Sequence, residues 1–301
     1  MRWRAGGGPV LGWYAPGRGE RESPLAFGGA VAFRVRGGRQ CLGVRRGGRW
    51  TACPAGAGVA GRATRAQCEE CARVDRAHSV AADTFADDPR PYHVYVAWFG
   101  PGLVKVGITG VARGGARLLE QGAVAYTWLG RGPLMAARRT EELLRTALGV
   151  PDRIPYARKR ALRARLPDAA ERARELAGLH RKAAALGGWP ESLDRLPPEV
   201  VDHGEVFGLD ALDRFDGSAG AGRVVDELTD GGVVAGTLVT AVGPDLHLEV
   251  GGRGSERGVV LDSRLMSGWR LVAVGDVTGP GGGSEVTVPV REIPVVQGGL
   301  F

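Results

Sequence analysis

The 301-residue sequence contains few lysines, few aromatic residues and no long apolar segment. Three lysines stand among 40 basic residues, and aromatic residues make up 6% of the chain. This arginine excess, together with 50 glycines, is typical of codon bias in a GC-rich genome, so arginine alone is weak evidence for phosphate contacts. The longest uncharged stretches, 91–104 and 231–244, are shorter than the roughly 20 apolar residues that a membrane-spanning helix needs. We therefore expect no membrane span.

The N-terminus also lacks the continuous apolar segment of a secretory signal, because Arg2 and Arg4 are followed by glycine and proline. We therefore expect a cytoplasmic protein. In that compartment thiols are kept reduced, so cysteines serve more often as metal ligands than as disulfides.

The net charge of +7 is unevenly distributed. The first 80 residues carry 14 arginines against five acidic residues, whereas the last 101 carry seven arginines against 15 acidic residues. This shift is the first sign of domain boundaries. Together with the cysteine spacing and the helix and strand patterns described below, it predicts an α+β protein of three parts: a cysteine-rich segment over 1–90, a central unit with basic helices over 91–190, and an acidic β-rich domain over 200–301. We expect the basic part to bind DNA or RNA and the acidic domain to contact a protein partner.

All four cysteines lie in one short segment, at Cys41, Cys53, Cys68 and Cys71. A C-x2-C turn directs two thiolates at one tetrahedral metal, and two more cysteines within about 30 residues complete a zinc-ribbon-like structural site. His78 is an alternative ligand, because Cys41 and Cys53 do not form a second C-x2-C pair. Two other interpretations stay open: four reduced cysteines without metal, or a redox pair at Cys68 and Cys71.

The central unit has the pattern of a β-β-α-β-α fold. Residues 92–99 and 103–109 are rich in β-forming side chains and flank a Gly-Pro-Gly turn, which predicts a hairpin. A short helix over 112–121 and a strand over 123–129 follow. Pro133 then opens a helix that we expect to run to about residue 148.

Glu141 is unusual on that last helix, because it lies on the apolar face. Its neighbours at helical spacing are Leu134, Ala137, Leu144 and Leu148. A carboxylate on an apolar face is costly unless a cation or a strong donor meets it, so Glu141 either pairs with an arginine or holds a metal ion. Its neighbour Glu142 instead lies beside Arg145, where a solvated ion pair is the simplest interpretation.

This order of elements resembles the GIY-YIG nuclease superfamily. His93-Val94-Tyr95 stands where that family has Gly-Ile-Tyr, and Lys105-Val106-Gly107 stands where it has Tyr-Ile-Gly, as in the divergent branch with Lys-Ile-Gly. Arg117 looks like the helical arginine of the family and Glu141 like its metal-binding glutamate. The whole chain, from the cysteine segment to the terminal Val-Gln-Gly-Gly-Leu-Phe, also resembles an uncharacterised actinobacterial family of unknown function.

The resemblance implies cleavage of a phosphodiester bond. Tyr95 would orient or deprotonate water, Arg117 would bind the scissile phosphate, and Glu141 would hold one Mg²⁺ or Mn²⁺ ion. Lys105 replaces the second tyrosine of the family. A lysine neutralises a phosphate, but it does not supply the proton transfer of a tyrosine.

Basic residues around this unit are candidates for nucleic-acid binding. Arg113 lies one helical turn before Arg117, and a dense run at Arg158, Lys159 and Arg160 follows the unit. One interpretation is a surface that contacts the phosphate backbone, and the other is a solvated helical face.

The C-terminal part reads as a set of short strands that predict a small β-barrel or sandwich. Residues 245–250 alternate strictly between polar and apolar side chains, which predicts one buried and one solvated face. The leading interpretation of the whole chain is a nucleic-acid-binding protein with a GIY-YIG-like core that hydrolyses phosphodiesters with a divalent metal. The alternative is a non-catalytic, zinc-stabilised scaffold that has lost this chemistry.

Overall fold

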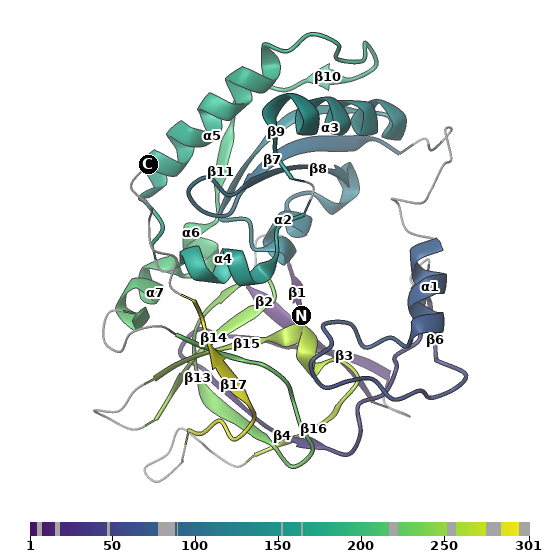
Figure 1. Ribbon diagram of the computed structural model, residues 1–301, viewed down its shortest axis with the longest axis vertical. Coiled ribbons are helices and arrows are strands. Elements are labelled where there is room, and N and C mark those ends of the chain that lie inside the picture. Colours follow the sequence, from purple (N-terminus) through teal and green to yellow (C-terminus); the bar gives the residue numbers. More distant parts are fainter. Residues whose placement is uncertain are drawn as a thin grey trace. The chain divides into compact units, whose positions relative to one another are not determined.

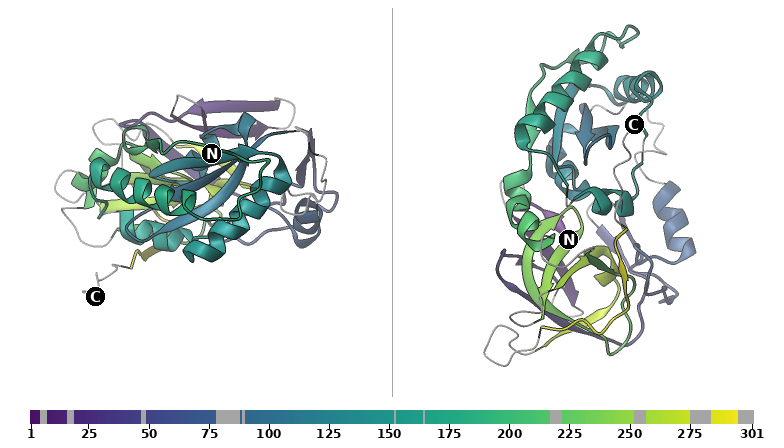
Figure 2. Two further views of the ribbon diagram at one scale, coloured as in Figure 1. Left: turned by 90° about the horizontal axis from the view of Figure 1, so that it is seen from above. Right: turned by 60° about the vertical axis from the view of Figure 1, so that its left-hand side comes forward.

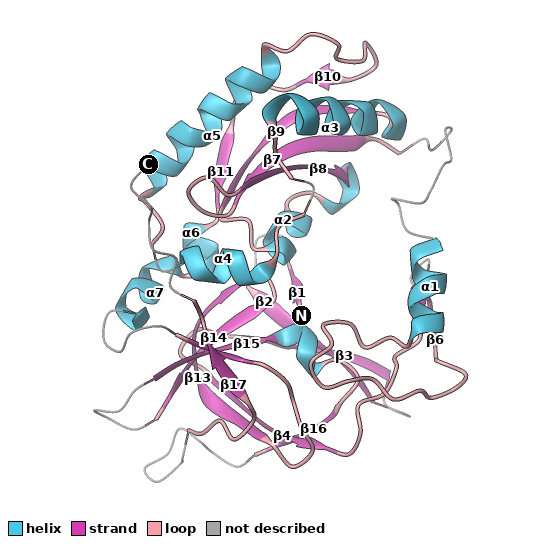
Figure 3. Cartoon of the chain, viewed as in Figure 1, coloured by secondary structure: helices cyan, strands magenta, loops and turns pink. Residues whose placement is uncertain are grey.

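The computed structural model mixes helices and strands along the chain, which confirms the α+β class (Figure 1 and Figure 3). It describes residues 1–4, 8–15, 19–46, 49–77, 88, 90–151, 153–163, 165–216, 222–251, 257–274 and 284–294. No helix in these ranges is long and apolar enough to cross a membrane.

The chain forms two compact units. The first is built from the described residues of Leu25–Thr84 and Arg214–Glu292, and the second from those of Arg2–Pro24 and Phe85–Asp213. This division differs from the three consecutive domains expected from the charge pattern, because strands far apart in sequence pair with one another.

A seven-stranded sheet forms the core of the first unit, in the order β16-β4-β13-β14-β15-β12-β17. Its strands are β4 (Ala30–Arg36), β12 (Arg223–Val225), β13 (Val233–Val242), β14 (Asp245–Val250), β15 (Arg257–Asp262), β16 (Arg270–Ala273) and β17 (Val290–Glu292), with the 3-10 helix η2 (Ser263–Met266) after β15. β4 comes from the N-terminal segment and lies between two C-terminal strands. The sheet formed by the described strands is open, not the closed barrel that was one of the two architectures expected.

The burial of β14 differs from the prediction that one face of residues 245–250 is solvated. Asp245 and His247 are buried along with the apolar residues of the strand, so both of its faces are covered. A central strand between β13 and β15 has no solvated face when neighbouring segments cover the sheet.

The cysteine segment of the same unit contains a two-stranded hairpin and one helix. These elements are β5 (Val44–Arg46), β6 (Arg49–Thr51) and α1 (Glu69–Ala77). α1 packs against β5.

The second unit contains a sheet in the order β10-β9-β7-β8, with β11 also paired to β9. Its elements are β7 (Tyr92–Trp98), β8 (Val104–Gly110), η1 (Val111–Arg113), α2 (Ala116–Gln121), β9 (Ala125–Gly132), α3 (Leu134–Leu148), α4 (Tyr156–Arg163), α5 (Ala169–Ala184), β10 (Asp194–Arg195), β11 (Val200–Asp202), α6 (Gly204–Phe207) and α7 (Leu209–Asp216), together with a small sheet of β1 (Arg2–Trp3), β2 (Pro9–Ala15) and β3 (Gly19–Pro24). From β7 to α3 the chain follows the hairpin, helix, strand and helix order expected from the sequence.

Local sequence explains where α3 begins and ends. Pro133 is the extended N-cap residue, with φ −61° and ψ 156°, so it opens the helix as predicted. Gly149 adopts a left-handed conformation with φ +63° and closes the helix. α3 packs against β7 and β8, which places Glu141 near the strands of the hairpin.

The two faces of β7 meet different helices. The indole N–H of Trp98 donates to a carboxylate oxygen of Glu175 at 2.7 Å, so this face lies against α5, the long teal-green helix of Figure 2. Side chains alternate along a strand, and Tyr95 and Ala97 therefore point to the other face. There they join an apolar cluster that includes Leu118 of α2.

Candidate functional site

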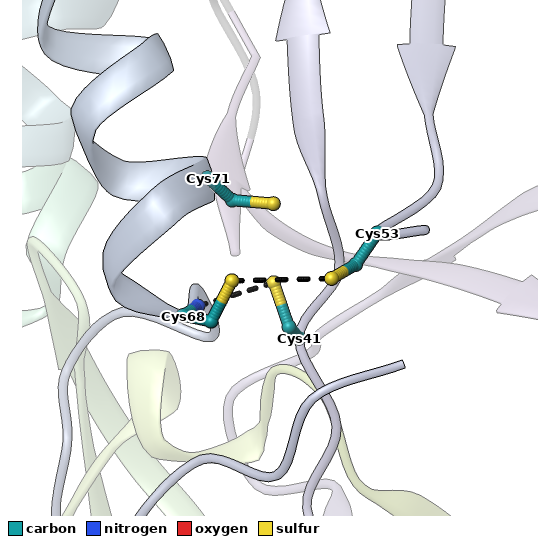
Figure 4. A group of neighbouring side chains, drawn as sticks. All are labelled: Cys41, Cys53, Cys68 and Cys71. Atoms are coloured by element: carbon teal, nitrogen blue, oxygen red, sulfur yellow. Dashed lines mark hydrogen bonds between the residues drawn. The ribbon is translucent and has the colours of Figure 1, made fainter. Parts of the chain in front are cut away.

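The four cysteines form a compact cluster in the first unit (Figure 4). Their sulfur atoms all lie within 4.8 Å of one another, and the Sγ atoms of Cys53 and Cys68 are 3.9 Å apart. Four thiolates around one zinc ion, with Zn–S bonds of about 2.3 Å, are separated by about 3.8 Å in a tetrahedron. The cluster is therefore placed to hold one metal ion such as zinc.

Backbone groups hold the cluster in shape. The N–H groups of Cys68 and Gly43 donate to the Sγ of Cys41 at 3.1 and 3.3 Å, so two backbone donors fix the position of that sulfur atom. Gly43 has φ +77°, and a Cβ there would lie 2.7 Å from the backbone nitrogen of Cys53. A glycine is therefore required where the chain passes this close to itself.

The electrostatics of the cluster differ from one thiol to the next. Backbone hydrogen bonds, led by that from Ala57, lower the pKa of Cys53 to about 6. Burial and the neighbouring cysteines raise the pKa of Cys71 far above its usual range. Like charges this close repel one another, and a divalent cation relieves that repulsion. His78 lies outside the described residues, and four sulfur ligands are present without it.

Tyr95 is the centre of a second group of side chains, in the second unit. It is 1% exposed and faces Gly107 in β8 and Trp128 in β9. The register between β7 and β9 shifts at Tyr95, which marks a β-bulge, a feature that is common next to active sites. The side-chain amide of Gln121 donates to the Tyr95 hydroxyl at 3.1 Å and holds its orientation.

Arg117 and Glu141, both predicted as site residues from the sequence, affect the ionisation of Tyr95. Burial raises the pKa of Tyr95, the Gln121 hydrogen bond and the positive charge of Arg117 lower it, and the negative charge of Glu141 raises it. Arg117 on α2 and Glu141 on α3 therefore both lie close enough to the Tyr95 hydroxyl to affect its ionisation. Lys105 is paired in register with Ala97, so it projects from the same face of the sheet as Tyr95.

The surroundings of Glu141 follow the helical pattern. The apolar neighbours Leu134, Ala137 and Leu144 are buried, whereas Glu141 itself is half-buried. Glu142 is exposed and forms the predicted ion pair with Arg145, at 2.6 Å. Among the described residues the four cysteines alone form a group of three or more potential ligand side chains, so Glu141 belongs to no such group.

The basic residues predicted to bind nucleic acid lie in different environments. Arg158 is exposed and Arg160 is half-buried, while Arg113 pairs with Glu120 at 2.6 Å. Lys159 is 4% exposed and is therefore not available to a phosphate, contrary to the prediction.

Lys159 can be buried because protein groups replace the water that would otherwise solvate its charge. Its ammonium group donates to the backbone oxygen of Gln121 at 2.8 Å and lies 3.8 Å from the centre of the Phe99 ring. A carbonyl oxygen and an aromatic face together stabilise a cation in this position. The helical repeat also places Arg163 on the buried side of α4.

A family model for proteins of unknown function, DUF2797, matches residues 28–271. The chain belongs to this family. The DUF2797 match includes all four cysteines and the whole segment from β7 to α3. No curated protein and no solved structure matches the chain.

One residue of the Tyr95 group in this DUF2797 chain, Gln121, was not predicted from the sequence. Gln121 joins two elements, because its side chain binds the Tyr95 hydroxyl and its backbone oxygen accepts from Lys159. A glutamine at the end of a short helix carries no sequence signal for such a role.

Proposed function

We propose that this protein binds nucleic acid and hydrolyses its phosphodiester bonds at a GIY-YIG-like site around Tyr95. The observation that carries the proposal is that the charges of Arg117 and Glu141, on two different helices, both lie near the Tyr95 hydroxyl. Lys105 projects from the same face of the sheet as Tyr95. A titratable group with a shifted pKa and charged neighbours from separate elements is a candidate active-site residue.

Each side chain has a role that follows from its environment. Arg117 is exposed and offers a planar guanidinium that binds two phosphate oxygens at once. Burial raises the pKa of Tyr95, so its hydroxyl stays protonated near neutral pH and does not act as the base. Because the side chain is only 1% exposed, its proposed role is to fix the geometry of the site and not to contact substrate directly. Lys105, on the same face, neutralises phosphate charge.

Glu141 is the residue that would hold a divalent ion. Mg²⁺ binds proteins through one or two carboxylates and keeps several water ligands, so the half-buried carboxylate of Glu141 fits it. When bound, such an ion stabilises the charge that develops on the phosphate and leaving oxygens.

The four cysteines would hold zinc in a structural role. Four sulfur ligands fill a tetrahedral site and leave no position for substrate. The segment has few large apolar side chains to bury, so metal binding would supply part of its folding free energy.

Turnover of DNA and RNA substrates with Mg²⁺ or Mn²⁺ tests the proposal. We expect Glu141→Gln to lower the cleavage rate about 100-fold or more, because it removes the charge that acts in the transition state. Glu142→Gln is the matched control, since it removes the same charge from the next, exposed position of α3. Equal rates in the two variants would contradict the proposal.

The burial of Tyr95 also favours a second function, that of a non-catalytic scaffold. Lys105 in place of a second tyrosine points the same way. In that case the protein binds nucleic acid but wild type and Glu141→Gln both show no turnover.

A further inference from the structure

The hairpin of β5 and β6 is an exposed feature of the cysteine segment. All three residues of β6 are exposed, and Trp50 at its centre is 38% exposed. The indole N–H of Trp50 donates to the backbone oxygen of Leu42, which fixes the orientation of the ring. An exposed tryptophan that is held in place presents a rigid apolar surface to a ligand.

The hairpin that carries this ring is rich in positive charge. Residues 44–51 contain three arginines and no acidic residue. Arg45 is the cross-strand partner of Trp50, so the two side chains project from one face of the hairpin. Arg45 and Arg49 are both exposed.

The cysteine cluster fixes the base of the hairpin. β5 begins soon after Cys41 and β6 ends just before Cys53, so the hairpin is the chain that connects these two sulfur ligands. The side-chain amide of Gln67 donates to the backbone oxygen of Gly43 at 3.0 Å and ties the same base to the start of α1. The described residues between the first two cysteines therefore include both strands of this hairpin.

We propose that this hairpin binds single-stranded nucleic acid, with an unpaired base stacked on Trp50 and a neighbouring phosphate on Arg45. Arg49, next to Trp50 along β6 and therefore on the other face of the hairpin, contacts a phosphate further along the strand. Tryptophan stacks on any exposed base, but a base within a duplex is already stacked on its neighbours. The combination of an oriented aromatic ring with arginines therefore favours a single strand over a duplex. The inference rests on nucleic acid as the ligand of the proposed function.

Binding of labelled short oligonucleotides to the zinc-loaded full-length protein, without Mg²⁺, tests the hairpin. Fluorescence anisotropy measures affinity for single-stranded and duplex DNA and RNA. Trp50→Ala should weaken single-strand binding about tenfold, because one stacked base is lost. Trp50→Phe should restore most of the affinity, and Tyr14→Ala, which removes an exposed ring from β2, should leave it unchanged.

The salt dependence of binding tests the arginines separately. The double variant Arg45→Gln/Arg49→Gln should reduce the slope of log affinity against log salt by about 1.4, or about 0.7 for each lost phosphate contact on a single strand. Arg36→Gln/Arg270→Gln is the matched control, because these are exposed cross-strand partners on β4 and β16 and the charge loss is the same. Equal slopes in the two double variants would overturn the hairpin site.

The results of these binding measurements distinguish failure of the hairpin site from failure of the proposed function. Single-strand binding that survives Trp50→Ala unchanged, or a preference for duplex, overturns the hairpin site alone. Loss of affinity in Trp50→Ala that Trp50→Phe does not restore also overturns it, because stacking is then not the cause. A wild-type protein that binds no nucleic acid overturns the hairpin site and the proposed function together.

Discussion

Tyr95 and Gly107 occupy facing positions of β7 and β8, and the ring of Tyr95 fills the space where a side chain at Gly107 would stand. A Cβ there would lie 2.5 Å from the Cζ atom of Tyr95. The Tyr95 ring is packed in a buried apolar cluster. Glycine at position 107 therefore fixes where the tyrosine hydroxyl lies.

Gly107→Ala should destabilise the protein by about 1–3 kcal/mol, the usual cost of overpacking a close-packed core. Urea unfolding measures this change. Gly187→Ala is the control, because a Cβ at Gly187 meets no atom within 4 Å. A Gly107→Ala protein as stable as the wild type would contradict the packing described for Tyr95.

The sequence predicted the local structure around Tyr95 well. The Gly-Pro-Gly turn, Pro133 and the β-forming runs are short-range signals, and each element from β7 to α3 lies close to where they indicate. The four cysteines also come together as their spacing suggested.

The long-range arrangement did not follow from local patterns. Pairing of β4 with β13 joins residues about 200 positions apart, and no periodicity within either segment encodes that partnership. The burial of Lys159 depends on the Phe99 ring and the Gln121 carbonyl, which reach it only in the folded unit.

Arg39 connects the cysteine segment to the end of the large sheet. Its buried guanidinium group donates only to backbone oxygens among the described residues, those of Ala60, Gly61, Ala63, Arg264 and Ser267. Arg39→Met should cost about 3 kcal/mol or more of unfolding free energy, because several buried carbonyl groups lose their donor. Urea unfolding checks this, with the exposed Arg36→Met as control. Equal stability of the two variants would show that the Arg39 hydrogen bonds contribute nothing.

Removal of metal should unfold the cysteine segment. We expect about one equivalent of zinc in purified protein, and a strong chelator should lower the melting temperature and expose four reactive thiols. Cys53→Ser should reproduce the effect without a chelator. Metal analysis and thiol titration check this. Four thiols that react freely in untreated protein would contradict the zinc site.

His203 should make stability depend on pH. It is buried between the rings of Tyr126 and Phe207, and its Nδ1 donates to the backbone oxygen of Ala123 at 2.8 Å. Burial lowers its pKa below the usual 6.5, so the unfolded chain binds the proton first as pH falls. Stability should therefore be complete above about pH 7 and decline as pH falls below about 6.5.

Replacement of this histidine isolates its contribution. In His203→Gln the part of the pH dependence between about pH 5 and 7 that comes from this side chain should disappear. Unfolding free energies measured across that range check it. If the curves of unfolding free energy against pH ran parallel for wild type and variant, His203 would have the same pKa in the folded and the unfolded chain.

The rate of phosphodiester cleavage by Glu141→Gln relative to Glu142→Gln is the most direct test of the site around Tyr95. Both changes remove one carboxylate from α3, but only Glu141 acts on the Tyr95 hydroxyl. We predict a loss of about 100-fold or more in Glu141→Gln and a wild-type rate in Glu142→Gln. Cleavage that is unaffected by Glu141→Gln would contradict the account.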